Sequence, residues 1–248
     1  MYMFGSGVMT ITPAGATPTP INVGLLQEGQ VSAKSTVKEL FGQYRDPLAI
    51  GAGTRKWTGK AKVARFSANV LNAIYFGGTI NAGMTTTAYE ADSVPATPGP
   101  YTVTTTNSAH YTADLGVIYA ATGLPFKRVA SVSAAGQYSV NTTTGVYTFD
   151  AADEGVPVII NYNWTNSTSG QSIVIPQALI GPTLTFGINF TGVDPTNNNV
   201  FTGQFWNAVC TDFDFSTKLE DFSMPDFQFS LFTNAAGSIG TYNFPDLF

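Results

Sequence analysis

Apolar and polar residues alternate along three stretches in the last third of the chain, and this pattern constrains the fold more than any other feature. In these stretches large apolar side chains recur on one side of the chain and polar ones on the other. Period-two alternation between Gly, Pro and Asn turns indicates antiparallel strands that bury one face. We therefore predict a mainly β protein, an antiparallel β-sandwich or partial barrel. The three stretches are 183–190, 204–215 and 227–231.

A further alternating stretch at 54–65 predicts a strand with one basic and one apolar face. Lys56, Lys60 and Lys62 share the basic face, and Trp57 belongs to the apolar one. The basic face lacks the aromatic residues that a stacking platform for nucleic acid needs. We therefore expect this face to meet another subunit or solvent.

One short helix is predicted at 66–76, where apolar residues recur at three- and four-residue spacing. Gly77 and Gly78 supply a stop at its C-terminal end. The Gly-Ala-Gly sequence at 51–53 is interpreted as a turn before a strand. It is not a phosphate-binding loop, because no helix follows it directly.

Turn-forming residues divide the chain into parts. The N-terminal residues are rich in Gly, Thr and Pro and predict an extended arm. A Pro-rich run at 93–100 opens a region of short β segments, with a hairpin at 137–149 and an exit linker at 166–170. The predicted division is an arm at 1–24, a main β domain at 25–92 and 167–248, and an inserted small β subdomain at 93–166.

Charged residues make up only 11% of the chain, against about 25% in a typical globular protein. Charge keeps soluble monomers apart, whereas the cores of protein interfaces are depleted in charge. The composition therefore favours a protein that assembles. An extracellular β module has a similar composition and remains the alternative.

The charges are unevenly distributed along the chain. Eight of the eleven Lys and Arg residues lie between Lys34 and Arg65, whereas 201–248 contains six acidic residues and one base, Lys218. The basic strand of one copy could meet the acidic segment of another, or the two regions could neutralise each other within one fold. The net charge of −5 argues against tight binding to duplex DNA.

No pattern of catalytic residues is found. His110 has no serine or cysteine nucleophile in a recognisable elbow near it, and Cys210 lies in an alternating strand where a buried or interface thiol is expected. Asp212 and Asp214 share one strand face, which indicates a solvated acidic surface rather than a calcium loop. We therefore predict that the protein is not an enzyme and needs no cofactor or metal.

The chain shows no targeting or membrane signals. Its first residues lack the basic region and long apolar run of a signal peptide. No apolar run approaches the roughly 18 residues of a membrane helix. With a single cysteine, no intramolecular disulfide can form. We expect a protein that is intracellular when it is made, with no membrane partner.

Several short motifs resemble, in their order and spacing, the tail tube proteins (major tail proteins) of tailed bacteriophages. The likeness covers most of the chain beyond about residue 25, and 93–166 resembles a β module common in phage structural proteins. The motifs are Leu-Leu-Gln-Glu-Gly at 25–29, Thr-Val-Lys-Glu-Leu-Phe-Gly-Gln at 36–43, Pro-Leu-Ala-Ile-Gly at 47–51, Arg-Lys-Trp-Thr-Gly-Lys-Ala-Lys at 55–62, Ala-Asp-Leu-Gly-Val-Ile-Tyr at 113–119, Gly-Gln-Tyr-Ser-Val at 136–140, Gly-Val-Tyr-Thr-Phe at 145–149, Lys-Leu-Glu-Asp-Phe at 218–222 and Asn-Ala-Ala-Gly-Ser-Ile-Gly at 234–240.

The resemblance implies hexameric rings that stack into a tube through which the genome passes, with no catalytic residues. The implied partners are further copies, other phage tail proteins and, transiently, double-stranded DNA. The implied location is the virion tail, with the host cytoplasm during assembly. An acidic lumen would repel DNA phosphates, and Asp212 and Asp214 are our candidates for lining it. Lys56, Lys60 and Lys62 are our candidates for a subunit interface, and we expect 93–166 to point outward.

Other functions remain open at this stage. A baseplate, tail-terminator or capsid decoration protein would share the low content of charged residues and the pattern of β-strands. A cell-surface or carbohydrate-binding β module would use Trp57, Trp164 and Trp206 as sugar platforms. The missing export signal disfavours this second class, and the missing catalytic constellation disfavours an enzyme.

Overall fold

The structure is a computed structural model that describes residues 7–65, 67–177, 179–181, 183–194, 198–217 and 219–245. The chain divides into two compact units. The first unit comprises the two ends of the chain, Met1–Ile80 and Ile173–Phe248, and the second comprises Asn81–Ser172. The predicted subdomain at 93–166 lies within the second unit. The second unit begins earlier and ends later in the sequence than predicted, because the strands that connect it to the first unit are long.

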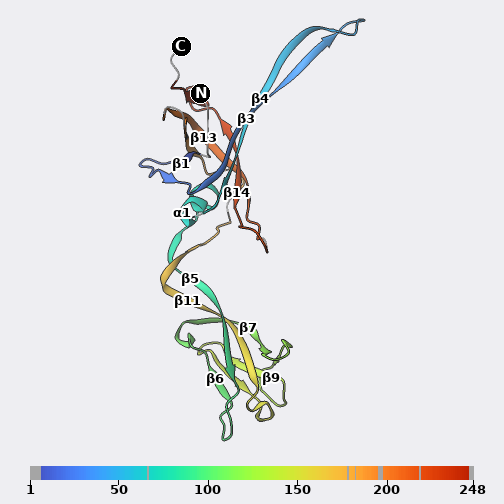
Figure 1. Cartoon of the computed structure of the whole chain (residues 1–248), viewed down its shortest axis with the longest axis vertical. Coiled ribbons are helices and arrows are strands. Elements are labelled where there is room, and N and C mark those ends of the chain that lie inside the picture. Colours follow the sequence, from blue (N-terminus) through green and yellow to red (C-terminus); the bar gives the residue numbers. More distant parts are fainter. Residues whose placement is uncertain are drawn as a thin grey trace. The chain divides into compact units, whose positions relative to one another are not determined.

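The first unit is built on an eight-stranded sheet (Figure 1). The strands follow the order β2-β1-β12-β13-β14-β4-β3, and β15 pairs with β13 outside this path. All of these pairings are antiparallel. The strands are β1 (Val8–Pro13), β2 (Ile21–Asn22), β3 (Leu26–Phe41), β4 (Pro47–Val63), β12 (Phe186–Val193), β13 (Val200–Asp214), β14 (Asp226–Phe232) and β15 (Gly240–Asn243).

The alternating residues of these strands form the core of the first unit, as predicted. Ile188 of β12, Phe205 of β13 and Phe227 of β14 are among the side chains buried in one cluster. At Gly59 of β4 the ring of Phe229 crosses the strand so closely that a Cβ would collide with it. Burial of this apolar face stabilises the sheet.

One short helix packs on this core. α1 (Ala68–Leu71) continues as a π-helical turn, η1 (Asn72–Phe76). Ser67 Oγ accepts a hydrogen bond from the Val70 amide at 3.3 Å, which satisfies one of the free donors at the helix start. Gly77, at a φ of 61°, ends the helix, as predicted. The predicted first residue, Phe66, lies outside the described residues.

The N-terminal arm is a correction to the prediction. β1 pairs with β12 along its whole length, and Met9 and Ile11 are buried in the core. Residues 8–13 and 21–22 of this segment are therefore strands of the sheet, and residues 1–6 lie outside the described part of the chain. The Gly, Thr and Pro content of the segment concealed a strand of only six residues.

The predicted turn at 51–53 is also wrong, because β4 passes through these residues without turning. The pairing of β3 with β4 shifts register between Ser35 and Val37, opposite Gly53 and Thr54, which is the signature of a β-bulge. A Cβ at Gly53 would collide with Thr36, so glycine permits the close approach of the two strands. The real turn lies between Phe41 and Pro47.

The second unit contains two further sheets. A three-stranded sheet has the order β5-β11-β7, and a four-stranded sheet has the order β6-β10-β9-β8. The predicted hairpin at 137–149 is confirmed as β9 and β10, whereas the predicted exit linker at 166–170 is wrong because β11 runs through it. The strands are β5 (Ile80–Ser93), β6 (Thr102–Thr104), β7 (Tyr111–Tyr119), β8 (Lys127–Arg128), β9 (Gln137–Asn141), β10 (Val146–Phe149) and β11 (Pro157–Ile173), and two 3-10 turns, η2 (Ser108–His110) and η3 (Ala151–Asp153), lie between them.

The predicted fold class is confirmed. The protein is mainly β, with antiparallel sheets and one short helix, and the sheets form no closed barrel in the described residues. Of the two predicted arrangements, sandwich and partial barrel, the structure is consistent with the sandwich. The pairing of β8 with β9 is the parallel exception.

Candidate assembly surface

β3 and β4 form a hairpin that extends well beyond the sheet to which it belongs (Figure 1). β4 pairs with β14 only from Trp57 to Lys62, whereas the pairing of β3 with β4 continues to Phe41 and Pro47. Every residue from 33 to 56, here named the projecting hairpin, is exposed. A two-stranded hairpin alone in water is marginally stable at best, so this element is a candidate for contact with another chain.

One face of the projecting hairpin carries three large apolar side chains, along with Glu39 and Arg55. Side chains two residues apart on a strand share a face, so Val37 and Phe41 follow Val31, which packs on the core. Ile50 joins them, because it lies opposite Glu39, and Val37 lies opposite Ala52. The exposed fractions of Val37, Phe41 and Ile50 are 55%, 53% and 64%. We call these three residues the apolar stripe. It continues the core face of the sheet to a place where the described residues leave it exposed.

The projecting hairpin also contains five cations and only two anions, Glu39 and Asp46. Lys34 and Lys56 lie directly opposite each other across β3 and β4, and like charges in that position destabilise a strand pair. In the described part of the chain, none of the five cations forms an ion pair. They are Lys34, Lys38, Arg45, Arg55 and Lys56.

Four of the five predicted site residues, Asp212, Asp214, Lys60 and Lys62, lie on one surface. On the outer face of the sheet, which is turned away from the core, Asp212 pairs with Gln228, and Gln228 pairs with Lys60. One step along, Asp226 lies between Asp214 and Lys62. β14 thus places acids of β13 and lysines of β4 on neighbouring strands.

A short ion pair joins the two groups. Lys60 Nζ lies 2.8 Å from Asp226 Oδ2. The hydrogen bond and the charge of Asp226 raise the pKa of Lys60, and the charges of Glu28 and Asp214 act in the same direction. Of the two interpretations of the charge distribution, neutralisation within one fold therefore holds for Lys60. Lys56 lies beyond the sheet, in the projecting hairpin, where the contact between copies stays a prediction.

The other half of the same outer face has no charged residues in its cross-strand rows. Thr10, Asn189, Gln204 and Thr241 are successive partners across β1, β12, β13 and β15. Beside this row lies a cleft of about 430 Å³, lined in part by Trp206, Asn207 and Pro18. Such a surface offers neutral hydrogen-bonding groups and one indole ring.

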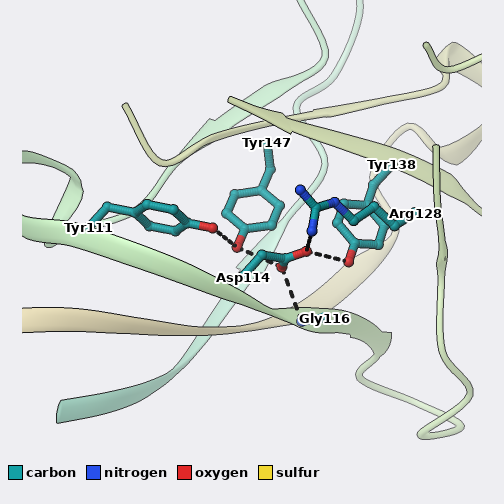
Figure 2. A network of polar contacts seen from close by, with 6 residues as sticks. All are labelled: Tyr111, Asp114, Gly116, Arg128, Tyr138 and Tyr147. Carbon is teal, nitrogen blue, oxygen red and sulfur yellow. Dashed lines mark hydrogen bonds and ion pairs between the residues drawn. The ribbon is translucent and has the colours of Figure 1, made fainter. Parts of the chain in front are cut away.

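The second unit contains a buried polar network around Asp114 (Figure 2). Asp114, on β7, has a side chain that is only 3% exposed. Its carboxylate accepts hydrogen bonds from the hydroxyls of Tyr138 at 2.8 Å and Tyr147 at 2.9 Å and from the Gly116 amide at 3.0 Å. Arg128 Nη1 lies 3.4 Å from Asp114 Oδ2. Buried charges are tolerated when they are paired and hydrogen-bonded in this way.

This network joins the two sheets of the second unit. Asp114 belongs to the three-stranded sheet, whereas Arg128, Tyr138 and Tyr147 belong to the four-stranded one. Burial, with the neighbouring charge of Asp114, raises the pKa of Tyr138 and Tyr147, so both phenols keep the protons that they donate. We infer that the network stabilises the fold by joining its two sheets.

Cys210 and His110, which were considered above as candidates for chemistry, occupy ordinary positions in the fold. Cys210 Sγ lies 3.3 Å from the Asp212 carbonyl oxygen, and burial raises the pKa of its thiol to about 11, which keeps it protonated near neutral pH. His110 is exposed at the end of η2. Of the three tryptophans, Trp57 and Trp164 pack against the two cores, whereas Trp206 is 41% exposed.

Within the described ranges, no group of three or more His, Cys, Asp or Glu residues is placed to hold a metal ion. In that same part of the chain, no helix is both long and apolar enough to span a membrane. Neither protein-family models nor curated proteins give a match to this sequence.

The sequence interpretation missed the projecting hairpin, although its residues carried part of the family resemblance. The available signal was the pair of apolar segments around Leu40 and Leu48, separated by a polar turn. The bulge at Gly53 and Thr54 interrupts the alternation that continues from 54–65, which concealed the full length of β4.

Proposed function

We propose that this chain is a structural protein of a virion, a tail tube subunit whose copies form hexameric rings that stack into a conduit for genome delivery. The projecting hairpin is the observation that carries the proposal. It presents Val37, Phe41 and Ile50 to solvent on a protein whose surface is already poor in charge. Fully burying a side chain of this size contributes roughly 1.5–3 kcal/mol, so association covers a face that costs free energy when exposed.

The proposal includes the partners and the location. The partners are further copies of the chain, other tail proteins and the double-stranded DNA that passes through the tube. The protein acts in the virion tail after assembly in the host cytoplasm. It acts by shape and surface, without a cofactor.

We propose further that the charged half of the outer face lines the lumen. Asp212 and Asp214 lie with Asp226 on this face, where Lys60 neutralises part of the charge. A net acidic wall repels phosphates, so that DNA slides without binding. In Asp212→Asn with Asp214→Asn, genome ejection should be slower at low salt and recover as salt screens the wall. Ejection equal to wild type at every salt concentration would count against this face.

Electron microscopy tests the assembly directly. Purified full-length protein is examined by negative stain while light scattering gives the particle mass. Six-fold rings or stacked tubes support the proposal. Particles of monomer mass throughout, up to the highest concentration reached, contradict it.

A second candidate is a carbohydrate-binding module, favoured by the uncharged cleft beside Trp206. Indole rings combine an apolar body with a polar edge, and Asn189 and Gln204 would hydrogen-bond to sugar hydroxyls. Titration with maltotetraose and chitotetraose tests this candidate. Chemical-shift changes that disappear in Trp206→Ala would support it, and unchanged spectra at millimolar sugar would exclude both sugars.

A further inference from the structure

We propose that residues 1–4 dock in an apolar groove of the first unit of the same copy, with the ring of Phe4 filling the groove. The groove has a volume of about 210 Å³, and its lining includes Phe190, Phe201, Phe205 and Tyr242. We call it the aromatic groove. The docking takes place within one copy, so it does not depend on the proposed assembly function.

The lining of the aromatic groove suits an aromatic guest. The rings of Phe201 and Tyr242 stack with centroids 5.7 Å apart, and the ring of Phe205 meets that of Tyr242 edge-on at 5.4 Å. Tyr242 is still 42% exposed, so a further apolar group can bury it. An apolar cavity of about 150 Å³ takes up a benzene molecule. The aromatic groove therefore has room for one aromatic side chain.

The chain enters the sheet beside this groove. Val8, the first residue of β1, pairs with Thr191 of β12. A Cβ on Gly7 would lie 3.2 Å from Cζ of Phe190, whose side chain belongs to the groove lining. The residue that precedes β1 therefore already lies against the wall of the groove.

The connection from Gly7 is long enough to bring Phe4 into the groove. Gly7 has a φ of 70°, a left-handed conformation that turns the chain and that glycine adopts without steric cost. Phe4 precedes it by three residues, and three residues span at most about 11 Å. A tether this short also gives the docking residues a high effective concentration at the groove, which favours the groove of the same copy over that of another.

The sequence at this end of the chain has the composition of an apolar anchor on a flexible tether. It reads Met-Tyr-Met-Phe at 1–4 and then Gly-Ser-Gly at 5–7. None of the four side chains is charged, so docking buries no charge. Methionine fills irregular apolar gaps and makes favourable contacts with aromatic rings.

The C-terminal end of the chain is the other segment within reach. Phe244 packs its ring 5.2 Å from that of Phe201, and three residues, Asp-Leu-Phe at 246–248, follow Pro245. The first of them would bring a carboxylate to an apolar lining, which is costly without a partner. We therefore assign the groove to residues 1–4.

Disulfide trapping in a Cys210→Ser background tests the docking. Phe4→Cys is combined with Val31→Cys, because Val31 lines the groove and is partly buried against the core. The matched control combines Phe4→Cys with Asn189→Cys, since Asn189 neighbours Phe190 on β12 but is exposed on the outer face. Both proteins are oxidised with a copper–phenanthroline complex, and intact mass after thiol alkylation gives the fraction of disulfide formed within one chain.

The proposal predicts a disulfide within one chain for the pair with Val31→Cys and reduced thiols for the pair with Asn189→Cys. Equal trapping at both positions, or trapping at neither, would overturn it. Disulfides that form only between chains would move the contact to a second copy and also overturn it. So would preferential trapping of Leu247→Cys with Val31→Cys, which would assign the groove to the C-terminal end.

Thermal unfolding gives an independent check. Phe4→Ser removes the docked ring and should lower the unfolding midpoint of the first unit by roughly 3 °C or more in scanning calorimetry. Tyr44→Ser is the control, because Tyr44 is 71% exposed at the turn of the projecting hairpin and its loss should leave the midpoint unchanged. A Phe4→Ser midpoint equal to that of the wild type would contradict the docking.

Discussion

The two units of the chain differ in how they accommodate side chains that are costly to leave without partners, such as a buried carboxylate or an exposed apolar stripe. In the second unit the buried Asp114 carboxylate is matched by Arg128, Tyr138 and Tyr147 from the facing sheet. In the first unit the projecting hairpin extends its apolar stripe and its cations beyond the sheet, where the stripe is exposed and the cations form no ion pair within the described residues. The second unit is thus held together by its own contacts, whereas we propose that another chain completes the first.

The largest expected effect comes from the apolar stripe. Phe41→Ser with Ile50→Ser should abolish assembly, because it removes apolar area that only a neighbour covers. The free energy of unfolding of the monomer should change little, within about 0.5 kcal/mol per exposed site. Light scattering and denaturant unfolding measure the two quantities.

Tyr89→Ser is the matched control for the stripe, since Tyr89 is 76% exposed in the second unit. It should leave assembly unchanged. If both variants lose assembly, the contrast between the two units disappears.

The next effect tests the self-sufficiency of the second unit. Asp114→Ala leaves two tyrosine hydroxyls, an amide and a guanidinium without their shared acceptor, which should cost about 2–4 kcal/mol of stability. Hydrogen exchange resolved by peptide should report the loss in β7, β9 and β10. As a control, Asp92→Ala removes an exposed carboxylate from the same unit and should change hydrogen exchange little. Equal effects of the two variants would show that the Asp114 network does not stabilise the second unit.

A smaller effect concerns pH. Burial alone would raise the pKa of Glu90, but hydrogen bonds from Thr106 and Tyr162 outweigh it and lower that pKa. Because the folded pKa lies below the unfolded value of about 4.3, Glu90 adds stability above that value. This contribution is lost as the pH falls through the folded pKa. Glu90→Gln should flatten the acid side of the stability profile, as measured by unfolding at pH 3 to 6. A profile identical to wild type would contradict this.

The smallest effect on assembly should follow removal of the whole second unit. The Val174 amide donates to the Thr79 carbonyl at 3.3 Å, so the cut ends lie side by side. A short Gly-Ser linker in place of 81–172 should therefore leave rings or tubes intact in the microscope. Loss of assembly would make the second unit part of the contact.

The sequence predicted the strands whose apolar faces bury on their own core. Phe186, Phe213 and Phe227 alternate in the sequence, and the structure packs all three on the core of the first unit. Alternation alone, however, cannot distinguish a face that meets its own core from one that meets another molecule. This is why the stripe at Val37 and Ile50 was missed.

It could not be predicted either that the acids of β13 and the lysines of β4 lie on the same outer face of the sheet. It depends on β14 lying between β13 and β4, which is a matter of strand order and not of local pattern. The same holds for Asp114, whose partners at 128, 138 and 147 come from the facing sheet.

Hydrogen exchange of the full-length protein at increasing concentration tests the central claim most directly. If the projecting hairpin is completed by a second copy, exchange at 33–56 should slow as assembly proceeds, while exchange in 81–172 stays constant. A hairpin that exchanges at the same rate in the monomer and in the assembled particle would contradict the account.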